Sequence, residues 1–375
     1  SATRVKSEYV EDAALQLHVV RGLGLNVPKA ELLHVNRDYL RGSDGSDWDE
    51  FFTRTDITAE VESLLVDIDD VVARQFDTLA SHIAPVIEPG KHCPDNCDYW
   101  ERCTADKPGD WILGLPALSQ QKFDRLTSRG IDSIGDIPED FPLSTVQSRI
   151  RSVIKTGEDY VGEFLERSLD QLDLPVAYLD FEAMNPAIPL FSDNRPYQQI
   201  PFQWSLHYKN SEGELSHEEY LASGKEDPRR EFATSLVDLM APGKEPIAVY
   251  SGYESWTLKS LGQAFPDLED YMEAISSRFV DLLKIIRQHV YLHEFGGSFS
   301  IKKVGPALVP EFSYGDIGAI IDGFAASNGF QRIATGSFEE GETEASVRKD
   351  LLAYCRHDTL AMVKIHEALI ALKDK

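Results

Sequence analysis

The sequence changes character after Leu174, where short β-rich runs replace the helical patterns that precede them. Three runs come first: PVAYLDFEA (175–183), IPFQWSLHY (200–208) and SHEEYLA (216–222). A fourth run covers 246–252, and the helical patterns cover 229–240, 254–264, 278–290 and 345–372. Strands that are later interleaved with helices favour a mixed sheet with helices on its faces. Residues 173–375 are therefore predicted to form an α/β domain.

The residues before this point are predicted to be mostly helical. Residues 8–21 have the apolar spacing of a helix, 30–41 resemble a strand, and a long helix is expected from Thr58 to about Ile83. Pro85, Pro89 and Gly90 then interrupt the chain. We predict two parts here, 1–107 and 108–172.

Residues 118–138 (LSQQKFDRLTSRGIDSIGDIP) have the form helix, Gly-Ile turn, short helix. This pattern resembles a helix-hairpin-helix element, in which backbone N–H groups of the turn face a phosphate. An ordinary helical linker over 108–172 is the alternative interpretation.

Charge restricts the class of partner. The chain of 375 residues has 37 basic and 63 acidic residues, a formal net charge of −26. A surface this acidic repels nucleic acid at long range, which argues against coating of long duplexes but allows a focused basic groove. No apolar run reaches the roughly 18 residues that a membrane span needs. We expect a cytoplasmic protein with no membrane partner. Because the sequence begins at Ser1 without Met, we also expect it to be a fragment of a longer gene product.

Three of the four cysteines, Cys93, Cys97 and Cys103, lie within eleven residues, whereas Cys355 is remote. A secreted disulfide framework has more cysteines in a shorter chain, so reduced thiols that bind a metal are the better interpretation. His92 would complete a zinc site, although an adjacent His–Cys pair fits one tetrahedral ion poorly. A segment that holds no metal is the alternative.

Acidic residues recur at spacings that would bring them together in the α/β domain. Asp180 and Glu182 are two residues apart on a predicted strand, so both lie on one face. Tyr354 and Asp358 are four apart on the last predicted helix, and Glu254 follows the fourth strand. Carboxylates that meet in this way repel one another unless cations lie between them. Hard oxygen ligands select Mg²⁺ or Mn²⁺, and two such ions about 4 Å apart support phosphodiester cleavage.

The order of these residues resembles that of the DnaQ-like (DEDD) exonuclease superfamily, which has an RNase H-like fold. The resembling stretches are YLDFEAMNPAIPLF, RPYQQIPFQWSLHY, VYSGYESWTL, FVDLLKII, GSFSIKKVGPAL and LLAYCRHDTLAM. Most similar is a poorly characterised bacterial domain family that is fused to RecB-like nucleases. The resemblance implies 3′–5′ hydrolysis at DNA or RNA ends with two Mg²⁺ or Mn²⁺ ions. It assigns the ions to Asp180, Glu182, Glu254 and Asp358, and the orientation of the attacking water to Tyr354, as in the tyrosine-type subclass.

The second motif departs from the family pattern. Members of the family have Asp where this sequence has Glu254, and Asn upstream where it has Ser251. Asp281 is a further acidic candidate, with a surface acid as the alternative. Lys302 and Lys303 are candidates for holding a phosphate backbone, with a solvated pair as the alternative.

Residues 1–107 resemble the C-terminal portion of RecB-like PD-(D/E)XK nucleases. The resembling stretches are VKSEYVEDAALQLHVV, LLHVNRDYLRG and HCPDNCDYWERC. In that family three late cysteines join an early one around a [4Fe–4S] cluster. The resemblance places Cys93, Cys97 and Cys103 as three ligands, but the early cysteine and the acidic motif would precede Ser1. The cluster is therefore expected to be incomplete here, with Cys355 a buried thiol.

The sequence thus predicts a metal-dependent nuclease, most simply a 3′–5′ exonuclease. One alternative is a degenerate, inactive RNase H-like scaffold that serves as a nucleic-acid-binding or assembly module of a two-nuclease fusion. An iron–sulfur redox or sensor protein is the other. Oligomeric state does not follow from the sequence.

Overall fold

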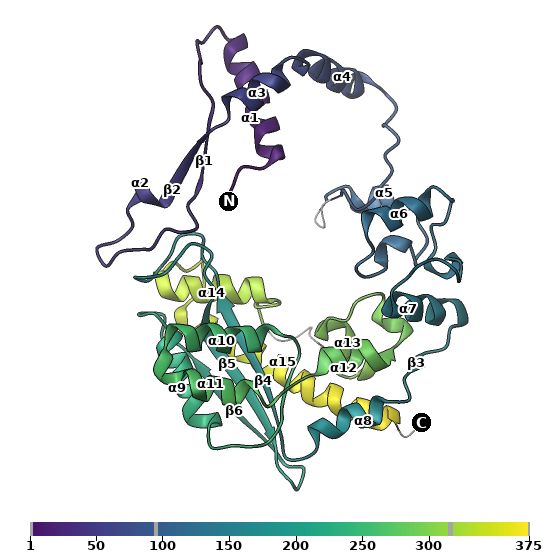
Figure 1. Cartoon of the computed structure of the whole chain (residues 1–375), viewed down its shortest axis with the longest axis vertical. Helices are drawn as coiled ribbons and strands as arrows, with labels where there is room; N and C mark the ends of the chain where they lie inside the picture. Colours follow the sequence, from purple (N-terminus) through teal and green to yellow (C-terminus); the bar gives the residue numbers. More distant parts are fainter. Residues whose placement is uncertain (1–2, 94–96, 314–317, 374–375) are drawn as a thin grey trace. The chain divides into compact units, whose positions relative to one another are not determined.

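The computed structural model describes residues 3–93, 97–313 and 318–373 (Figure 1). Its internal contacts divide the chain into two compact units. The first unit contains Ser1–Glu88 and Asn185–Gln199, and the second contains Pro89–Met184 and Ile200–Lys375. The division therefore differs from the three consecutive parts that the sequence predicted.

A five-stranded mixed sheet forms the centre of the second unit, in the order β6-β5-β4-β7-β8. The strands are β4 (Val176–Met184), β5 (Ile200–Lys209), β6 (Leu215–Leu221), β7 (Ile247–Val249) and β8 (Phe279–Asp281). Strands β4, β5 and β6 pair antiparallel, whereas β4, β7 and β8 pair parallel. The middle strand, β4, is buried along most of its length.

Helices cover both faces of this sheet, and alternation along β4 separates the two faces. Leu179 and Phe181 pack in one apolar cluster with α9 (Arg229–Met240), α10 (Tyr253–Ala264) and α11 (Glu269–Ser276). The long α15 (Glu344–Lys373) and α14 (Gly323–Thr335) also contact β4. Tyr178, on the other face, donates or accepts a hydrogen bond of 2.8 Å with His366 of α15. Asp180 and Glu182 share the face of Tyr178 because side chains alternate along a strand.

The residues between Pro89 and Leu172 form short helices and one short strand. They are α5 (Trp100–Thr104), η1 (Ile112–Gly114), α6 (Gln120–Thr127), η2 (Ile134–Asp136), α7 (Thr145–Thr156), β3 (Tyr160–Val161), α8 (Leu165–Leu169) and η3 (Asp170–Leu172). One hydrophobic cluster runs from Trp111 and Phe123 to Tyr178 and Met362. Strand β3 also pairs with β9 (Val290–Tyr291). Since they share a core with the sheet domain, these helices are an integral layer of the unit.

The helical turn that was expected to face a phosphate has its amides engaged internally. The N–H groups of Gly130 and Ile131 donate to carbonyls of α6, at 2.9 and 3.1 Å. The N–H groups of Ile134 and Gly135 donate to the carbonyl and carboxylate oxygens of Asp110, at 2.8 and 3.0 Å. These amides are therefore not directed at a ligand.

The first unit is a small hairpin with helices: α1 (Ser7–Gly22), β1 (Glu31–Val35), α2 (Trp48–Phe51), β2 (Phe52–Asp56), α3 (Thr58–Leu65) and α4 (Ile68–Ala80). Strands β1 and β2 pair antiparallel. The separate segment 185–199 joins this unit through Arg41, whose N–H donates to Asn194 and whose carbonyl accepts from Asp193. Tyr197 packs against the cluster formed by Val35, Tyr39 and Phe51.

The predicted α/β class, with a mixed sheet and flanking helices, is confirmed. The predicted strands and helices after Leu174 are present, with two differences. Residues 278–290 begin with strand β8 before α12 (Leu282–His289), and α11, α13 (Ile301–Leu308) and α14 were not predicted. In the first unit the strand ends at Val35, and the single long helix is two helices, α3 and α4. No helix within the described ranges has both the length and the apolar character needed to cross a bilayer.

Candidate active site

Three elements bring the predicted acidic residues to one end of the sheet. Asp180 is the middle residue of β4, and Glu182 lies two residues before its end. Glu254 lies in the first turn of α10, which follows β7, and β7 runs parallel to β4. Ala248 of β7 pairs with Tyr178, so β7 ends beside the middle of β4 and the β7–α10 connection lies close to Asp180. Tyr354 and Asp358 come from α15, which packs on the face of β4 that carries the acids.

The site is enclosed by protein. Glu182, Glu254 and Asp358 have exposed fractions of 7%, 3% and 7%, and Tyr354 has 4%. A carboxylate oxygen of Asp180, one of Glu182 and the sulfur of Cys355 all lie within 4.8 Å of one another. Cys355 is fully buried, and its Sγ lies 3.7 Å from Oδ2 of Asp180. Buried acids this close to one another are rare without a counter-charge.

Burial and mutual repulsion raise the carboxyl pKa values. Burial is the largest cause for Asp180, followed by Asp358, Glu182 and Glu254, and together they hold its pKa well above the usual range. Burial and then Asp358 raise the pKa of Glu182 to about 8. Burial raises the pKa of Glu254 to about 7, despite hydrogen bonds that lower it. Each raised pKa means that the ionised carboxylate is not fully stabilised by nearby positive charge.

Ser251 orients one of these acids. Its hydroxyl donates to Oε2 of Glu254 at 3.1 Å and accepts from the N–H of Tyr253 at 3.0 Å. Ser251 thus fixes the position of the Glu254 carboxylate. Asp281 caps α12 by accepting from the N–H of Lys284 at 3.0 Å, and its charge also raises the pKa of Glu254. Asp281 therefore belongs to the edge of the site.

Lys302 of α13 brings a positive charge to the cluster, whereas Lys303 is exposed. The Nζ atom of Lys302 lies 5.0 Å from the ring centroid of Tyr354, and its charge lowers the pKa of Glu182. Lys302 also donates a hydrogen bond to the carbonyl of Ile321. Of the two candidate lysines, only Lys302 is in the cluster, within the described residues.

The start of α14 is the part of the site that the sequence did not reveal. A Cβ atom on Gly323 would lie 3.8 Å from Oε2 of Glu182, and the charge of Asp322 contributes to the raised pKa of Glu182. Asp322 caps α14 by accepting from the N–H of Ala325 at 2.7 Å. The sequence signal for the start of this helix was Asp322, directly before Gly323, since Asp is a preferred N-cap residue.

The acidic residues of the candidate site form a donor set that suits hard divalent cations. The acids of the candidate site offer carboxylate oxygens, which Mg²⁺ and Mn²⁺ prefer, and their raised pKa values show repulsion that cations would relieve. Cys93, Cys97 and Cys103 are each half-buried. Among the described residues they form no group whose ligand atoms converge, unlike Asp180, Glu182 and Cys355. Cys355 is a buried thiol, as expected.

Comparisons with known proteins add one finding. The fold and the site define an α/β unit whose central strand carries two acidic residues of the candidate site. Within it, a family model described as a domain of unknown function (DUF2779) matches residues 177–300, which include Asp180, Glu182 and Glu254. Searches of curated proteins and of solved structures give no match.

Proposed function

We propose that this chain is a divalent-metal-dependent nuclease that hydrolyses phosphodiester bonds at the ends of DNA or RNA strands, most simply as a 3′–5′ exonuclease. The observation that supports it is the convergence of four acids from three elements that are far apart in the sequence: Glu182, Glu254 and Asp358 are buried, and Asp180 is half-buried. The cytoplasm as location belongs to the same proposal, as does descent from the DnaQ-like superfamily.

Energetics favour a site built for cations. A protein has no structural reason to bury several carboxylates together, because each costs desolvation and repels the others. We assign the cations to Asp180, Glu182, Glu254 and Asp358. When bound, two divalent ions would supply a water of lowered pKa and positive charge near the leaving oxygen.

Side chains of the chain itself would position the reactants. Burial, and then Asp358, Glu182 and Asp180, raise the pKa of the Tyr354 hydroxyl. The hydroxyl therefore stays protonated and can orient a water molecule beside Asp358. Lys302, next to the Tyr354 ring, would contact the anionic phosphate of the substrate. Both roles require that water and substrate enter next to α13 and α15.

Degradation of end-labelled single-stranded DNA and RNA with Mn²⁺ tests the proposal. We expect activity in the natural sequence and its loss in Asp180→Asn, which keeps the size of the side chain. Asp270→Asn, the same change at an exposed position of α11, serves as the matched control and is expected to retain activity. Equal activity in Asp180→Asn would refute the assignment. Strand binding without any cleavage would favour the inactive binding module instead.

A further inference from the structure

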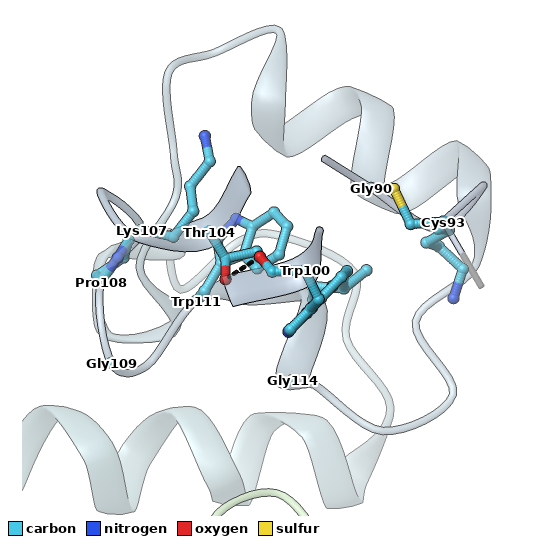
Figure 2. Close-up of a pocket in the computed structure, with 11 residues that line it drawn as sticks. Gly90, Cys93, Trp100, Thr104, Lys107, Pro108, Gly109, Trp111 and Gly114 are labelled. Atoms are coloured by element: carbon cyan, nitrogen blue, oxygen red, sulfur yellow. Dashed lines mark hydrogen bonds between the residues drawn. The ribbon is translucent and has the colours of Figure 1, made fainter. Parts of the chain in front are cut away.

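A cavity lies in the helical layer, among residues that the proposed hydrolysis does not use. It has a volume of about 630 Å³ and is lined by residues within 90–93 and 100–114. Figure 2 shows Trp100, Thr104 and Trp111 together in its middle, with Lys107 beside the Trp111 indole and Gly90 and Cys93 on the opposite side. Its volume lies within the range of small-molecule sites, about 300–1,000 Å³.

The lining has the opposite charge balance to the chain. Two of its described members, Lys91 and Lys107, are basic, and none of the described members is acidic. The chain as a whole has a formal net charge of −26. Lys107 Nζ lies 5.6 Å from the ring centroid of Trp111 and 3.8 Å from Asp132, whereas Lys91 donates to the carbonyl of Leu118. A positive pocket in so acidic a protein favours an anionic ligand.

An indole donor in this lining has no partner. Trp111 is 8% exposed, and its Nε1 atom is buried without a hydrogen-bond acceptor. A buried donor left without an acceptor is destabilising, so such groups usually have a role. The adjacent Trp100 ring has its centroid 6.0 Å away, tilted by 41°. The pocket therefore offers aromatic surface, and one of its rings carries a buried donor that a ligand reaches only after the indole shifts.

We propose that this pocket binds a nucleotide unit, an aromatic base that carries a phosphate. The indoles of Trp100 and Trp111 would contact the base, as aromatic side chains do in single-strand binding. After a shift of the indole, Nε1 of Trp111 would donate to a base carbonyl or ring nitrogen. Lys107 and Lys91 would exchange their contacts with Asp132 and the carbonyl of Leu118 for the phosphate. An uncharged lipid-like ligand would leave the indole donor without an acceptor.

A ligand with a base and a phosphate can come from two sources, a free mononucleotide or one residue of a bound single strand. The second source deepens the proposed function, on which it then rests, because the pocket would grip the strand that the nuclease degrades. Binding itself requires neither metal nor Asp180. The experiment can therefore be done with EDTA, where cleavage does not occur.

The test is titration of the full chain with thymidine, with thymidine 5′-monophosphate and with a fluorescein-labelled (dT)12 strand. Trp111→Phe keeps an aromatic ring and removes the donor, so we expect about fivefold weaker binding of nucleoside and nucleotide alike. Lys107→Met keeps the apolar stem, and we expect about tenfold weaker binding of the monophosphate with thymidine unchanged. Trp48→Phe, at a 53% exposed position of the first unit, is the matched control.

The outcomes separate this proposal from the nuclease assignment. Weaker binding of the monophosphate in both pocket variants, with Trp48→Phe unchanged, supports a free-nucleotide site. Weaker binding in both pocket variants that is seen with (dT)12 alone supports a bound strand as the ligand. Absence of binding by all three probes, or equal affinity in Trp111→Phe, Lys107→Met and the natural sequence, overturns the proposal. Asp180→Asn is expected to bind as the natural sequence does, so loss of nuclease activity there does not bear on this pocket.

Discussion

Two candidate metal sites differ in how their residues are brought together. The acids of the first lie as far apart in the sequence as Asp180 and Asp358, yet they meet because β4, α10 and α15 are fixed by a buried core. The cysteines of the second lie within eleven residues, yet Cys93, Cys97 and Cys103 remain half-buried and do not converge. The difference agrees with the general rule that sites built on helices and strands are held more precisely than sites on loops.

The largest expected effect tests the contrast between the acidic site and the cysteine segment. We expect Glu182→Gln to lower Mn²⁺-dependent hydrolysis about a thousandfold, since loss of a metal ligand removes several kcal/mol of stabilisation. Cys97→Ser should change the rate less than about twofold, on the scale of a surface substitution. Steady-state rates with an end-labelled strand measure both. Similar losses in the two variants would place the cysteine segment in the active site.

Tyr354→Phe should have the next largest effect, because it removes the hydroxyl that we assign to the attacking water. We expect hydrolysis to fall by about 10–100-fold, within or just below the range for a positioned proton-transfer group. The pH profile should change with the rate, whereas the Tm should not fall. Tyr271→Phe, at an exposed position of α11, is the matched control. A large loss of Tm instead would assign Tyr354 a structural role.

Lys302→Met tests the role of the lysine that lies beside the acidic residues. We expect KM for the strand to rise about tenfold with a smaller change in kcat, because one phosphate contact is lost. Lys303→Met changes the exposed neighbour on the same helix and should leave both constants unchanged. Equal effects of the two substitutions would indicate a general loss of positive charge rather than a contact in the site.

The smallest effect is on stability and follows from the raised carboxyl pKa values. The pKa is about 8 for Glu182 and about 7 for Glu254, both above the ordinary 4.5, so the folded state holds these protons more tightly than the unfolded state. Their stabilising contribution is complete below about pH 4.5 and is lost as the pH rises through 7–8. With EDTA, the Tm should therefore fall by several degrees, at roughly 2–4 °C per kcal/mol, between pH 5 and pH 8.5.

Thermal scans with and without Mn²⁺ measure this effect. The rise in Tm on adding Mn²⁺ should grow with pH, because the cation binds the ionised carboxylates. Glu182→Gln should flatten the pH dependence in EDTA. A Tm that is independent of pH in the natural sequence would contradict the coupling among these acids.

The sequence predicted those parts of the molecule that depend on local patterns of apolar and polar residues. The strand that carries Asp180 and Glu182 is a long apolar run, and α15 carries Tyr354 and Asp358 one turn apart, so both were found. Strand β8 was missed because its three residues continue directly into α12. The start of α14 was missed because GFAASNGFQRIAT has several small residues and no clear helical stripe. Only tertiary packing brings Gly323 to Glu182.

The packing of segment 185–199 with the first unit has a consequence for truncation of the chain. The chain passes between the two units at residues 88–89, again at 184–185 and again at 199–200. Deleting residues 1–88 would therefore leave a remnant of the first unit, the fifteen residues 185–199, without Arg41 and the cluster at Tyr39. This remnant follows β4 at Met184, two residues after Glu182. An unpartnered insertion would thus interrupt the second unit directly after the strand that carries two of the candidate ligands.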